Sequence, residues 1–224
     1  MVRAIIFDFD GVIADTEDLH FFCLRQTLLE EGININRQLY NEVYLALDDK
    51  TCFKQAFIRD GREITVEKLT KLVKRKSQLF YSRLTSIKLF PGIVEWIREA
   101  SLNFTLAICS GAAKQEIIDI LTLYNLLENF MTITSAEDVQ NCKPSPEGYL
   151  RTLQRLNECL NSRPKLTGAE CLVIEDSHAG IEAAKAAGMY CVGVTNSHSQ
   201  EYLREADIVI SCITELSLEH IKAL

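Results

Sequence analysis

Six short runs of apolar and β-branched residues recur along the chain, separated by longer segments with a helical spacing of apolar positions. Continuous apolar runs of this length are typical of parallel strands that helices cover on both faces. Strands that alternate with helices therefore predict an α/β fold, a doubly wound, Rossmann-like parallel sheet. The runs are RAIIFDF (3–9), FTLAICS (104–110), MTITSA (131–136), CLVIED (171–176), YCVGVT (190–195) and DIVIS (207–211).

The segment from about residue 16 to 85 breaks this alternation, because it contains only patterns typical of helices. An all-helical block inserted after the first strand predicts a second, smaller domain at 16–85, with the α/β core formed by 1–15 and 86–224. In the core, the helix over 177–188 is expected to end on Gly188. Helices are predicted over 17–32, 41–49, 51–61 and 65–84 in the insertion, and over 91–102, 112–127 and 177–188 in the core.

Composition limits the kind of partner. The 224 residues include 24 Lys and Arg against 31 Asp and Glu, a net charge of −7 that argues against a broad nucleic-acid or anionic-membrane surface. No stretch approaches the roughly 20 apolar residues of a membrane span, and the first residues lack the apolar segment of a signal peptide. The eight cysteines form no CxxC pair, which favours free, mostly buried thiols in a reducing compartment. We therefore expect a cytoplasmic protein without nucleic-acid or membrane partners, and a monomer by default.

Two carboxylates stand where the first apolar run ends. Asp8 and Asp10 are two positions apart, so in an extended chain they project to the same side. Ligands of open α/β sheets bind beyond the carboxyl ends of the strands, and Gly11 allows a sharp turn or a close approach there. Two neighbouring carboxylates repel unless a cation lies between them, and Mg²⁺ prefers hard oxygen ligands. The stretch predicts a magnesium site; a solvated turn is the alternative.

A second acidic pair, Glu175 and Asp176, ends another predicted strand. Its alternative explanation is helix capping, because Asp176 or Ser177 could satisfy free N–H groups of the following helix. Together with the first pair, it favours a shared metal site.

Two further strand ends add donors and positive charge. Ser110 and Gly111 are expected at the start of a helix, where a hydroxyl and backbone N–H groups favour an anion, or where Ser110 is an ordinary N-cap. Lys143 precedes Pro144 in a predicted loop, where a lone lysine usually faces solvent. Taken together, the strand ends offer a nucleophile, a metal site, an oxyanion donor and a counter-charge, which is the equipment of phosphoryl transfer.

In these residues the whole chain resembles the haloacid dehalogenase (HAD) superfamily, and within it the β-phosphoglucomutase-like phosphatases with a helical cap. DFDGVIADTE matches the first motif, DxDGx(V/I)xD(T/S), which is highly specific. CSG matches the second motif, KPSPEGY the third and IEDSHAGIEAAKAAGM the fourth. The resemblance implies an α/β core with an inserted all-helical cap domain.

The resemblance also implies roles for the motif residues. Asp8 would be the nucleophile that forms an aspartyl phosphate, and Asp10 the general acid and then the base. Asp8, the backbone carbonyl of Asp10 and Asp176 would hold Mg²⁺, with Glu175 as a ligand or close to the ligands. Ser110 and Lys143 would hold the phosphoryl oxygens, with N–H groups from Gly111 and Ala112.

Within the family, the cap decides the substrate. Thr16 and His20 match positions near the hinge and the leaving group, although His20 could equally be an ordinary residue of an amphipathic helix. Lys76 matches a lysine that reaches a substrate phosphate, although an exposed helix face explains it nearly as well. The arginine of a GxSRxxS loop, which sugar-phosphate mutases carry, is absent from LALDDKTCF, where Lys50 is the nearest cation. A lysine does not replace a bidentate arginine, which favours a hydrolase.

The sequence thus predicts a Mg²⁺-dependent phosphatase acting on a small phosphorylated metabolite, plausibly a sugar phosphate. A β-phosphoglucomutase-type phosphotransferase, which passes the phosphoryl group to a sugar hydroxyl, is the alternative enzyme. From another class, a phospho-receiver signalling module also places an acidic cluster and a lysine on a doubly wound sheet. It needs neither the helical insertion nor an acid two residues after the nucleophile.

Overall fold

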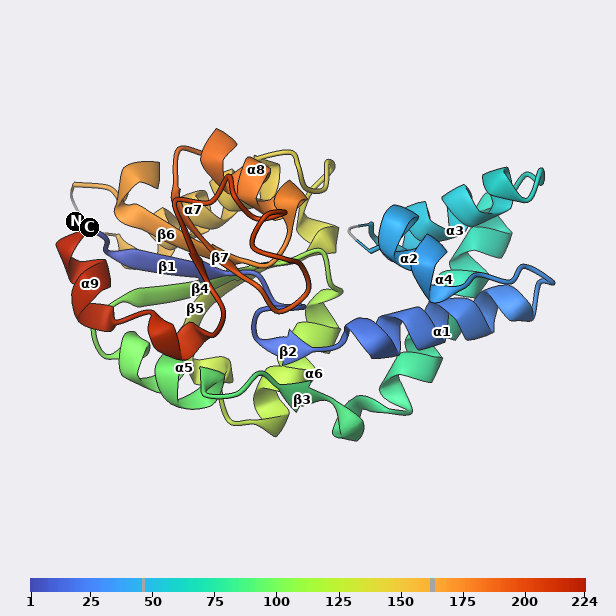
Figure 1. Cartoon of the computed structure of the whole chain (residues 1–224), viewed down its shortest axis with the longest axis horizontal. Coiled ribbons are helices and arrows are strands. Elements are labelled where there is room, and N and C mark those ends of the chain that lie inside the picture. Colours follow the sequence, from blue (N-terminus) through green and yellow to red (C-terminus); the bar gives the residue numbers. More distant parts are fainter. Residues whose placement is uncertain (46, 162–163) are drawn as a thin grey trace. The chain divides into compact units, whose positions relative to one another are not determined.

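The computed structural model describes residues 1–45, 47–161 and 164–224. The chain divides into two compact units, which we call the α/β unit, Met1–Asp15 with Lys88–Leu224, and the helical unit, Thr16–Ile87 (Figure 1). The predicted insertion, 16–85, begins at the same residue as the helical unit and ends two residues earlier.

Among the described residues, one sheet of six parallel strands forms the centre of the α/β unit, in the order β5-β4-β1-β6-β7-β8. All six predicted runs form these strands. β1 lies between β4 and β6, so the carboxyl ends of these three strands are neighbours, and the residues that follow them meet at one edge. The strands are β1 (Ala4–Phe7), β4 (Thr105–Cys109), β5 (Phe130–Thr134), β6 (Cys171–Glu175), β7 (Tyr190–Val194) and β8 (Ile208–Ile210).

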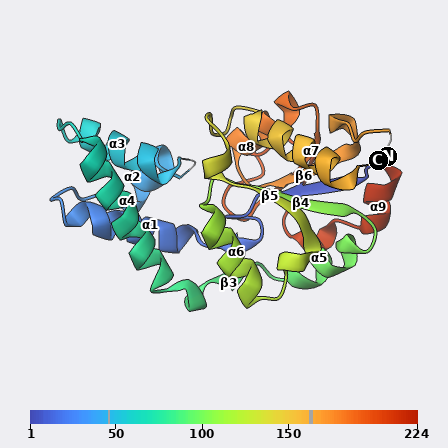
Figure 2. The same cartoon turned by 180° about the vertical axis from the view of Figure 1, so that it is seen from behind.

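Helices cover both faces of the sheet, which confirms the doubly wound α/β architecture (Figures 1 and 2). Successive residues of β1 serve opposite faces. Ile6 belongs to the buried cluster that α7 and α8 complete, whereas the Phe7 ring packs edge-on against Trp96 of α5, with 5.8 Å between centroids. The helices of this unit are α5 (Ile93–Ser101), α6 (Lys114–Leu123), α7 (Glu147–Leu160), α8 (His178–Ala186) and α9 (Leu218–Ala223). Of these, α7 and α9 were not predicted.

A short turn follows β1 and shapes the site. The Phe9 carbonyl accepts hydrogen bonds from the backbone N–H groups of Ile13 (2.9 Å) and Ala14 (3.0 Å). The chain then enters β2 (Ala14–Asp15), which pairs antiparallel with β3 (Lys88–Leu89). This two-residue ladder, which the sequence did not suggest, joins the two ends of the α/β unit between which the helical unit is inserted.

The helical unit contains no strand among its described residues, as predicted. Its own apolar cluster includes Leu24, Tyr40, Phe53 and Leu72, one from each of its helices. The helices are α1 (Glu17–Leu29), α2 (Arg37–Val43), α3 (Asp49–Arg59) and α4 (Val66–Tyr81).

The helix predicted over 41–49 is wrong in its bounds. The Asn36 side chain accepts a hydrogen bond from the Leu39 N–H at 2.8 Å, so an N-cap starts α2 earlier than the apolar pattern suggested. At the other end, the Asp48 carboxylate caps α3. The described residues between Val43 and Asp49 are not helical, and Ala46 lies outside the described part of the chain.

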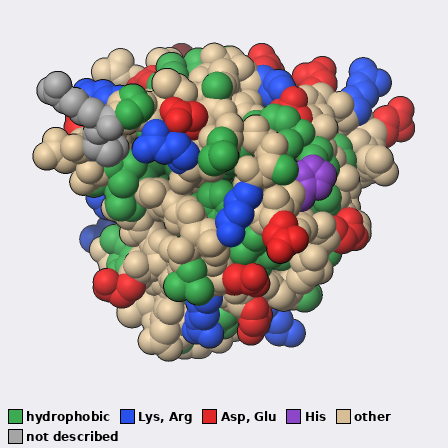
Figure 3. Space-filling model, turned by 90° about the vertical axis from the view of Figure 1, so that its left-hand side faces the viewer, with side chains coloured by type: hydrophobic (Ala, Val, Ile, Leu, Met, Phe, Trp, Pro, Cys, Tyr) green, Lys and Arg blue, Asp and Glu red, His purple; other side chains and the backbone are tan. Residues whose placement is uncertain are grey.

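Two further features can be compared with what composition predicted, the state of the cysteines and the distribution of charge on one face. All eight cysteines are free thiols, and five of them are buried. Basic and acidic side chains are interspersed on the face in Figure 3, without a broad patch of one sign. None of the helices within the described ranges has the length and apolar character needed to cross a membrane.

Candidate active site

Asp8 directly follows β1 at the carboxyl edge of the sheet. Its backbone N–H donates to the Ile174 carbonyl of β6 at 2.9 Å, which continues the strand pairing to the residue that carries the carboxylate. Asp8 is only 8% exposed. The register of β1 and β6, which pairs Phe7 with Ile174, thereby sets Asp8 beside Glu175 and Asp176.

Gly11 makes room for the second acidic pair. Its φ of +77° is in the left-handed region that favours glycine. A Cβ at this position would lie 1.8 Å from Asp176 Oδ2 and 2.8 Å from Ser197 Oγ. The chain therefore turns sharply at Gly11, and the group that its backbone approaches closely is the Asp176 carboxylate, where a ligand was the predicted alternative.

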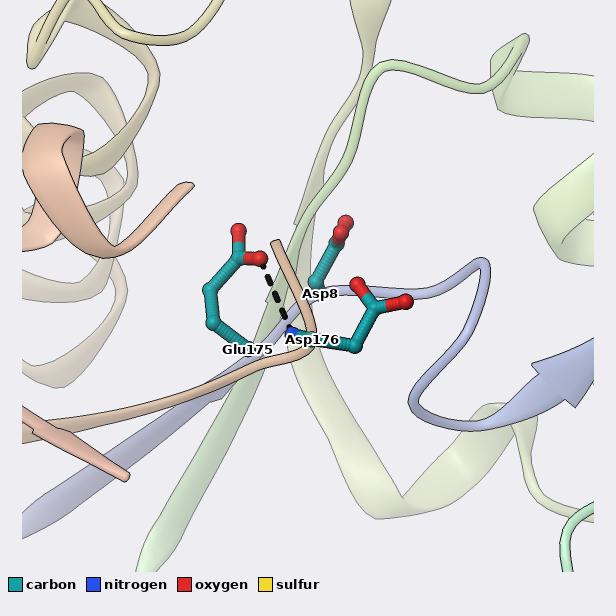
Figure 4. Close-up of side chains that lie close together, drawn as sticks. All are labelled: Asp8, Glu175 and Asp176. Carbon is teal, nitrogen blue, oxygen red and sulfur yellow. Dashed lines mark hydrogen bonds between the residues drawn. The ribbon is translucent and has the colours of Figure 1, made fainter. Parts of the chain in front are cut away.

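Three buried carboxylates gather at the ends of β1 and β6: Asp8, Glu175 and Asp176 (Figure 4). Each offers an oxygen atom, and these atoms lie within 4.8 Å of one another. The capping role that the sequence left open belongs to Ser177, whose hydroxyl accepts from the Gly180 N–H at 3.1 Å. Asp176 is therefore not needed as the cap of α8.

Lys143 reaches this acidic cluster from the loop before α7. Its Nζ lies 2.9 Å from Asp8 Oδ1 and 2.5 Å from Glu175 Oε1, and its side chain is only 17% exposed. The solvent-facing alternative for this lysine is thus wrong in this structure. The ammonium bridges the predicted nucleophile and the second acidic pair.

The electrostatics of the cluster follow from burial and from an excess of negative charge. Burial raises the pKa of Asp8 to about 7, although the Lys143 ammonium opposes the shift. Burial and the neighbouring Glu175 and Asp8 carboxylates raise the pKa of Asp176 well above its ordinary value. Burial by itself lowers the pKa of Lys143, but the two carboxylates that it contacts raise it overall. Ionising all three acids in this environment calls for a further cation.

The oxygen-rich donor set fits a hard divalent ion. Three ionised carboxylates and one ammonium would leave 3 − 1 = 2 uncompensated negative charges in a buried space. Mg²⁺ is bound in proteins by oxygen ligands of this kind. Asp8 and Asp176 are the side chains best placed as ligands, because both oxygens of Glu175 already accept hydrogen bonds from the protein.

Ser110, Gly111 and Lys143, which the resemblance assigned to phosphate binding, line one cavity. Ser110 does not begin a helix, however, because α6 starts at Lys114 and Ala113 is its N-cap. The Ser110 hydroxyl instead accepts from the Ala112 N–H at 3.1 Å. The Ala112 N–H is therefore bonded within the loop in this structure, whereas the family resemblance implied that it faces a phosphate.

Asp10 occupies the turn between β1 and β2, where it is half-buried and forms a bridge with Ala14. Its side chain does not belong to the group of three carboxylates found among the described residues. The strand itself ends at Phe7, but the Asp10 carboxylate remains close enough to Asp8 for its charge to help raise the pKa of Asp8.

The helical unit holds a polar cluster of its own, formed by His20, Asp49 and Lys76. Lys76 is only 5% exposed, which excludes the exposed helix face as its explanation. Its ammonium forms an ion pair with Asp49 and lies 3.0 Å from His20 Nδ1. The His20 ring stacks on Phe80, with 4.8 Å between centroids.

The other two residues predicted in this unit differ in burial and position. Thr16 is buried at the residue before α1, and its carbonyl accepts from the His20 N–H at 2.9 Å. Lys50 is exposed in the first turn of α3.

Three residues of these sites were missed at the sequence level. Tyr149 donates to Glu175, Asp49 neutralises Lys76, and Gly180 packs so closely on Glu175 that a Cβ would lie 1.8 Å from Oε1. Tyr149 and Gly180 stand within the quoted motifs, so their position was visible but not their contact.

Comparison with known proteins supports the same assignment. Residues 5–194 match the family model of the haloacid dehalogenase-like hydrolases. The chain is 32% identical to the Bacillus subtilis (strain 168) protein named "Putative phosphatase YhcW", over 88% of this chain and 84% of that one. It is 30% identical to the phosphorylated carbohydrates phosphatase of Thermotoga maritima, over 88% of this chain and 87% of that one.

Among solved structures, the chain is similar to β-phosphoglucomutase from Clostridium difficile. The TM-score is 0.87 at 26% identity, and the match covers 100% of this chain and 96% of the other. The predicted superfamily and its β-phosphoglucomutase-like branch are thus confirmed, and an enzyme is favoured over a receiver module. With this fold, and with the motif residues gathered at one edge of its sheet, the chain belongs to the haloacid dehalogenase-like hydrolase family.

Proposed function

We propose that this protein is a Mg²⁺-dependent phosphatase that hydrolyses a small phosphorylated carbohydrate through an aspartyl phosphate on Asp8. The observation that carries the proposal is the buried contact between Asp8 and Lys143 within the acidic cluster, at 2.9 Å. A carboxylate nucleophile needs a neighbouring positive charge to receive a phosphoryl group. Lys143 supplies such a charge directly beside Asp8.

The chemistry runs in two displacements. An Asp8 oxygen forms a bond to phosphorus while the bond from phosphorus to the substrate oxygen breaks, and Asp10 protonates the departing alkoxide. Water then attacks the aspartyl phosphate, Asp10 accepts a proton from it, and Asp8 is released together with inorganic phosphate. The position of Asp10 beside the nucleophile supports this role, since its charge helps to raise the pKa of Asp8.

Asp8 and Asp176 would hold Mg²⁺ through their carboxylates, and Asp10 through its backbone carbonyl. When bound there, the ion supplies positive charge that offsets the carboxylates and the charge of the phosphoryl group. Glu175 would lie next to these ligands without binding the ion itself. Its oxygens already accept hydrogen bonds from Lys143, Tyr149 and the Asp176 N–H.

Ser110, Gly111 and Lys143 would bind the phosphoryl oxygens from the cavity that they line. The Ser110 hydroxyl has its own hydrogen free to donate, because in its bond to Ala112 it acts as the acceptor. Lys143 contributes a buried ammonium, whose interaction with an anion is stronger than it would be in water.

The helical unit is proposed as the cap that selects the substrate. His20 and Lys76 would recognise the carbohydrate, with Thr16 and Lys50 as weaker candidates. Two observations support a phosphorylated carbohydrate: the buried polar cluster around Lys76, and the similarity to the phosphorylated carbohydrates phosphatase of Thermotoga maritima.

Asp49 favours hydrolysis over a mutase reaction. A mutase must hold the phosphate that does not react, which calls for strong uncompensated positive charge. In the helical unit the buried Lys76 already forms an ion pair with Asp49. The segment LALDDKTCF, which corresponds to the arginine-bearing loop of the mutases, contains no arginine. The similarity to a β-phosphoglucomutase keeps phosphoryl transfer to a sugar hydroxyl as the second candidate.

The test is phosphate release by the purified protein with Mg²⁺ across a panel of phosphorylated carbohydrates and other small phosphate esters. The reaction with β-glucose 1-phosphate is also followed for glucose 6-phosphate. Release of inorganic phosphate from a subset of the panel is the expected result. Glucose 6-phosphate without matching phosphate would establish the mutase instead. Activity that persists in EDTA, or in Asp8→Asn, would contradict the mechanism.

A further inference from the structure

Tyr149, in the first turn of α7, carries a buried hydroxyl that contacts the acidic cluster and has no role in the proposed reaction. Its side chain is fully buried in the apolar cluster under the sheet, and its hydroxyl donates to Glu175 Oε1 at 2.7 Å. A tyrosine that served only to fill this space would not need the hydroxyl, and phenylalanine would pack as well.

Glu175 is the residue through which the hydroxyl acts. Its Oε1 accepts from both Lys143 Nζ (2.5 Å) and the Tyr149 hydroxyl (2.7 Å). Its Oε2 accepts from Ser177 Oγ at 3.0 Å and from the Asp176 and Ser177 N–H groups at 3.2 and 3.3 Å. The carboxylate is thus fixed at both ends, with the Tyr149 hydroxyl as one of the two donors on the oxygen that faces Lys143.

The position of Lys143 depends on how strongly each carboxylate attracts it. Its ammonium is shared between Glu175 Oε1 and Asp8 Oδ1, at 2.5 and 2.9 Å. A donor on Oε1 satisfies part of that oxygen's hydrogen-bonding capacity, which weakens its hold on the ammonium. Without the hydroxyl, Oε1 would be a stronger and less constrained acceptor, and Lys143 would be drawn away from Asp8.

We infer that Tyr149 is a positioning residue that, through Glu175, keeps the Lys143 ammonium directed toward Asp8 and the phosphoryl group. The inference rests on the proposed function, because it assigns to Lys143 the binding of a phosphoryl group. Tyr149 itself touches neither substrate nor metal. It acts by positioning the Lys143 ammonium, which binds the phosphoryl group.

The decisive variant is Tyr149→Phe, which keeps the ring 5.4 Å from Lys143 Nζ and removes only the hydroxyl. Tyr190→Phe is the matched control, because Tyr190 begins β7 at the opposite edge of the same sheet. Removing a partner that orients a site residue typically costs about 10-fold to 100-fold in affinity or activity. We expect a loss of that size in the affinity for inorganic phosphate, titrated by calorimetry into protein saturated with Mg²⁺.

A double-mutant cycle with Glu175→Ala distinguishes a positioning role of Tyr149 from a purely structural one. If the hydroxyl acts through Glu175, Tyr149→Phe weakens phosphate binding in the parent protein but changes it less than twofold in the Glu175→Ala background. An equal loss in both backgrounds would overturn the inference. The melting temperature of each variant is measured alongside, so that a variant that does not fold is recognised.

The outcomes also separate this inference from the proposed function. If the parent protein hydrolyses no phosphate ester and binds no inorganic phosphate, the proposed function fails. If the parent binds phosphate and Tyr149→Phe binds it with the same affinity, only the role of Tyr149 is overturned. Where a substrate is known, kcat/KM should fall in Tyr149→Phe by the same factor as the phosphate affinity, and Tyr190→Phe should match the parent.

Discussion

Each unit of the molecule buries a lysine, and the two lysines differ in the balance of charge around them. Lys143 of the α/β unit contacts Asp8 and Glu175 in a cluster that also holds Asp176. Lys76 of the helical unit contacts Asp49 and His20. The first cluster has more negative charge than the lysine can offset, whereas the Lys76 ammonium of the second forms an ion pair with one carboxylate, Asp49.

Under the proposed function, this difference would separate a site for the reaction from a site for substrate recognition. An excess of buried negative charge is unfavourable unless a cation joins it, so the first cluster is poised to take up a metal ion. A balanced pair presents polar groups without a strong net charge. Such a pair suits the hydroxyl groups of a carbohydrate better than a second phosphate.

The largest expected effect is the loss of the nucleophile. Asp8→Asn keeps the shape of the side chain but cannot form the aspartyl phosphate, and turnover should fall by about 10,000-fold or more. Asp10→Asn should reduce it by about 100-fold to 10,000-fold, as for loss of a general acid. Phosphate release is measured with equal protein and saturating Mg²⁺. Turnover near the parent value in either variant would refute the proposed mechanism.

Gly180 of α8 packs against Glu175, so a substitution there should disturb the acidic cluster. Gly180→Ala would normally stabilise a helix by about 1 kcal/mol, but here the Cβ would lie 1.8 Å from Glu175 Oε1. We expect instead a destabilisation of about 1–3 kcal/mol, as for overpacked sites, together with a loss of activity. Urea unfolding measures the free energy.

The same substitution in the Glu175→Ala background is its control. Removing the carboxylate removes the clash, so Gly180→Ala should there be neutral or stabilising. If Gly180→Ala stabilised the parent protein as well, the inference that α8 packs too tightly on Glu175 to admit a Cβ would be contradicted.

The balanced cluster is tested by Lys76→Met. Methionine fills a similar buried volume but leaves the partly exposed Asp49 carboxylate without its ion-pair partner, so the free energy of unfolding should fall by about 1–3 kcal/mol. The value of kcat/KM for the preferred substrate should fall roughly tenfold, equivalent to about 1.4 kcal/mol. Lys54→Met, at an exposed position of the same unit, is the control and should leave kcat/KM unchanged. Parent-like kinetics in Lys76→Met would make the cluster purely structural.

The smallest expected effect concerns an ion pair outside both clusters. Arg155 Nη2 lies 2.5 Å from Asp138 Oδ1, and this hydrogen bond, with those from Ser135, lowers the pKa of Asp138. A carboxyl with a lowered pKa stabilises the fold above its unfolded pKa of about 3.9, and this stabilisation is lost as the pH falls below that value. Asp138→Asn should therefore cost about 1 kcal/mol at pH 7.

The check is urea unfolding of Asp138→Asn and the parent at pH 7 and at pH 3. The difference between the two proteins should shrink at the lower pH, with phosphate release unaffected at pH 7. A difference that stays constant would mean that the ion pair does not contribute through its charge.

The sequence by itself determined the strands, the order of the motifs and the edge at which they meet. Continuous apolar runs have few ways to be buried other than as central strands, and residues that follow parallel strands necessarily lie at one edge. Asp8, Lys143, Glu175 and Asp176 could therefore be expected together. The inserted helices were equally visible, because periodicity of apolar residues is a local property.

Tertiary structure decided what depends on contacts between distant residues. The helix predicted over 41–49 is incorrect because the Asn36 and Asp48 caps set the helix ends, and Ser110 stands before its helix because α6 begins at Lys114. No local pattern shows that Asp49 neutralises Lys76, 27 residues away, or that the Tyr149 hydroxyl meets Glu175, 26 residues away. Such partners are chosen by the packing of whole elements, and they fix where charge is balanced and where it is left for a ligand.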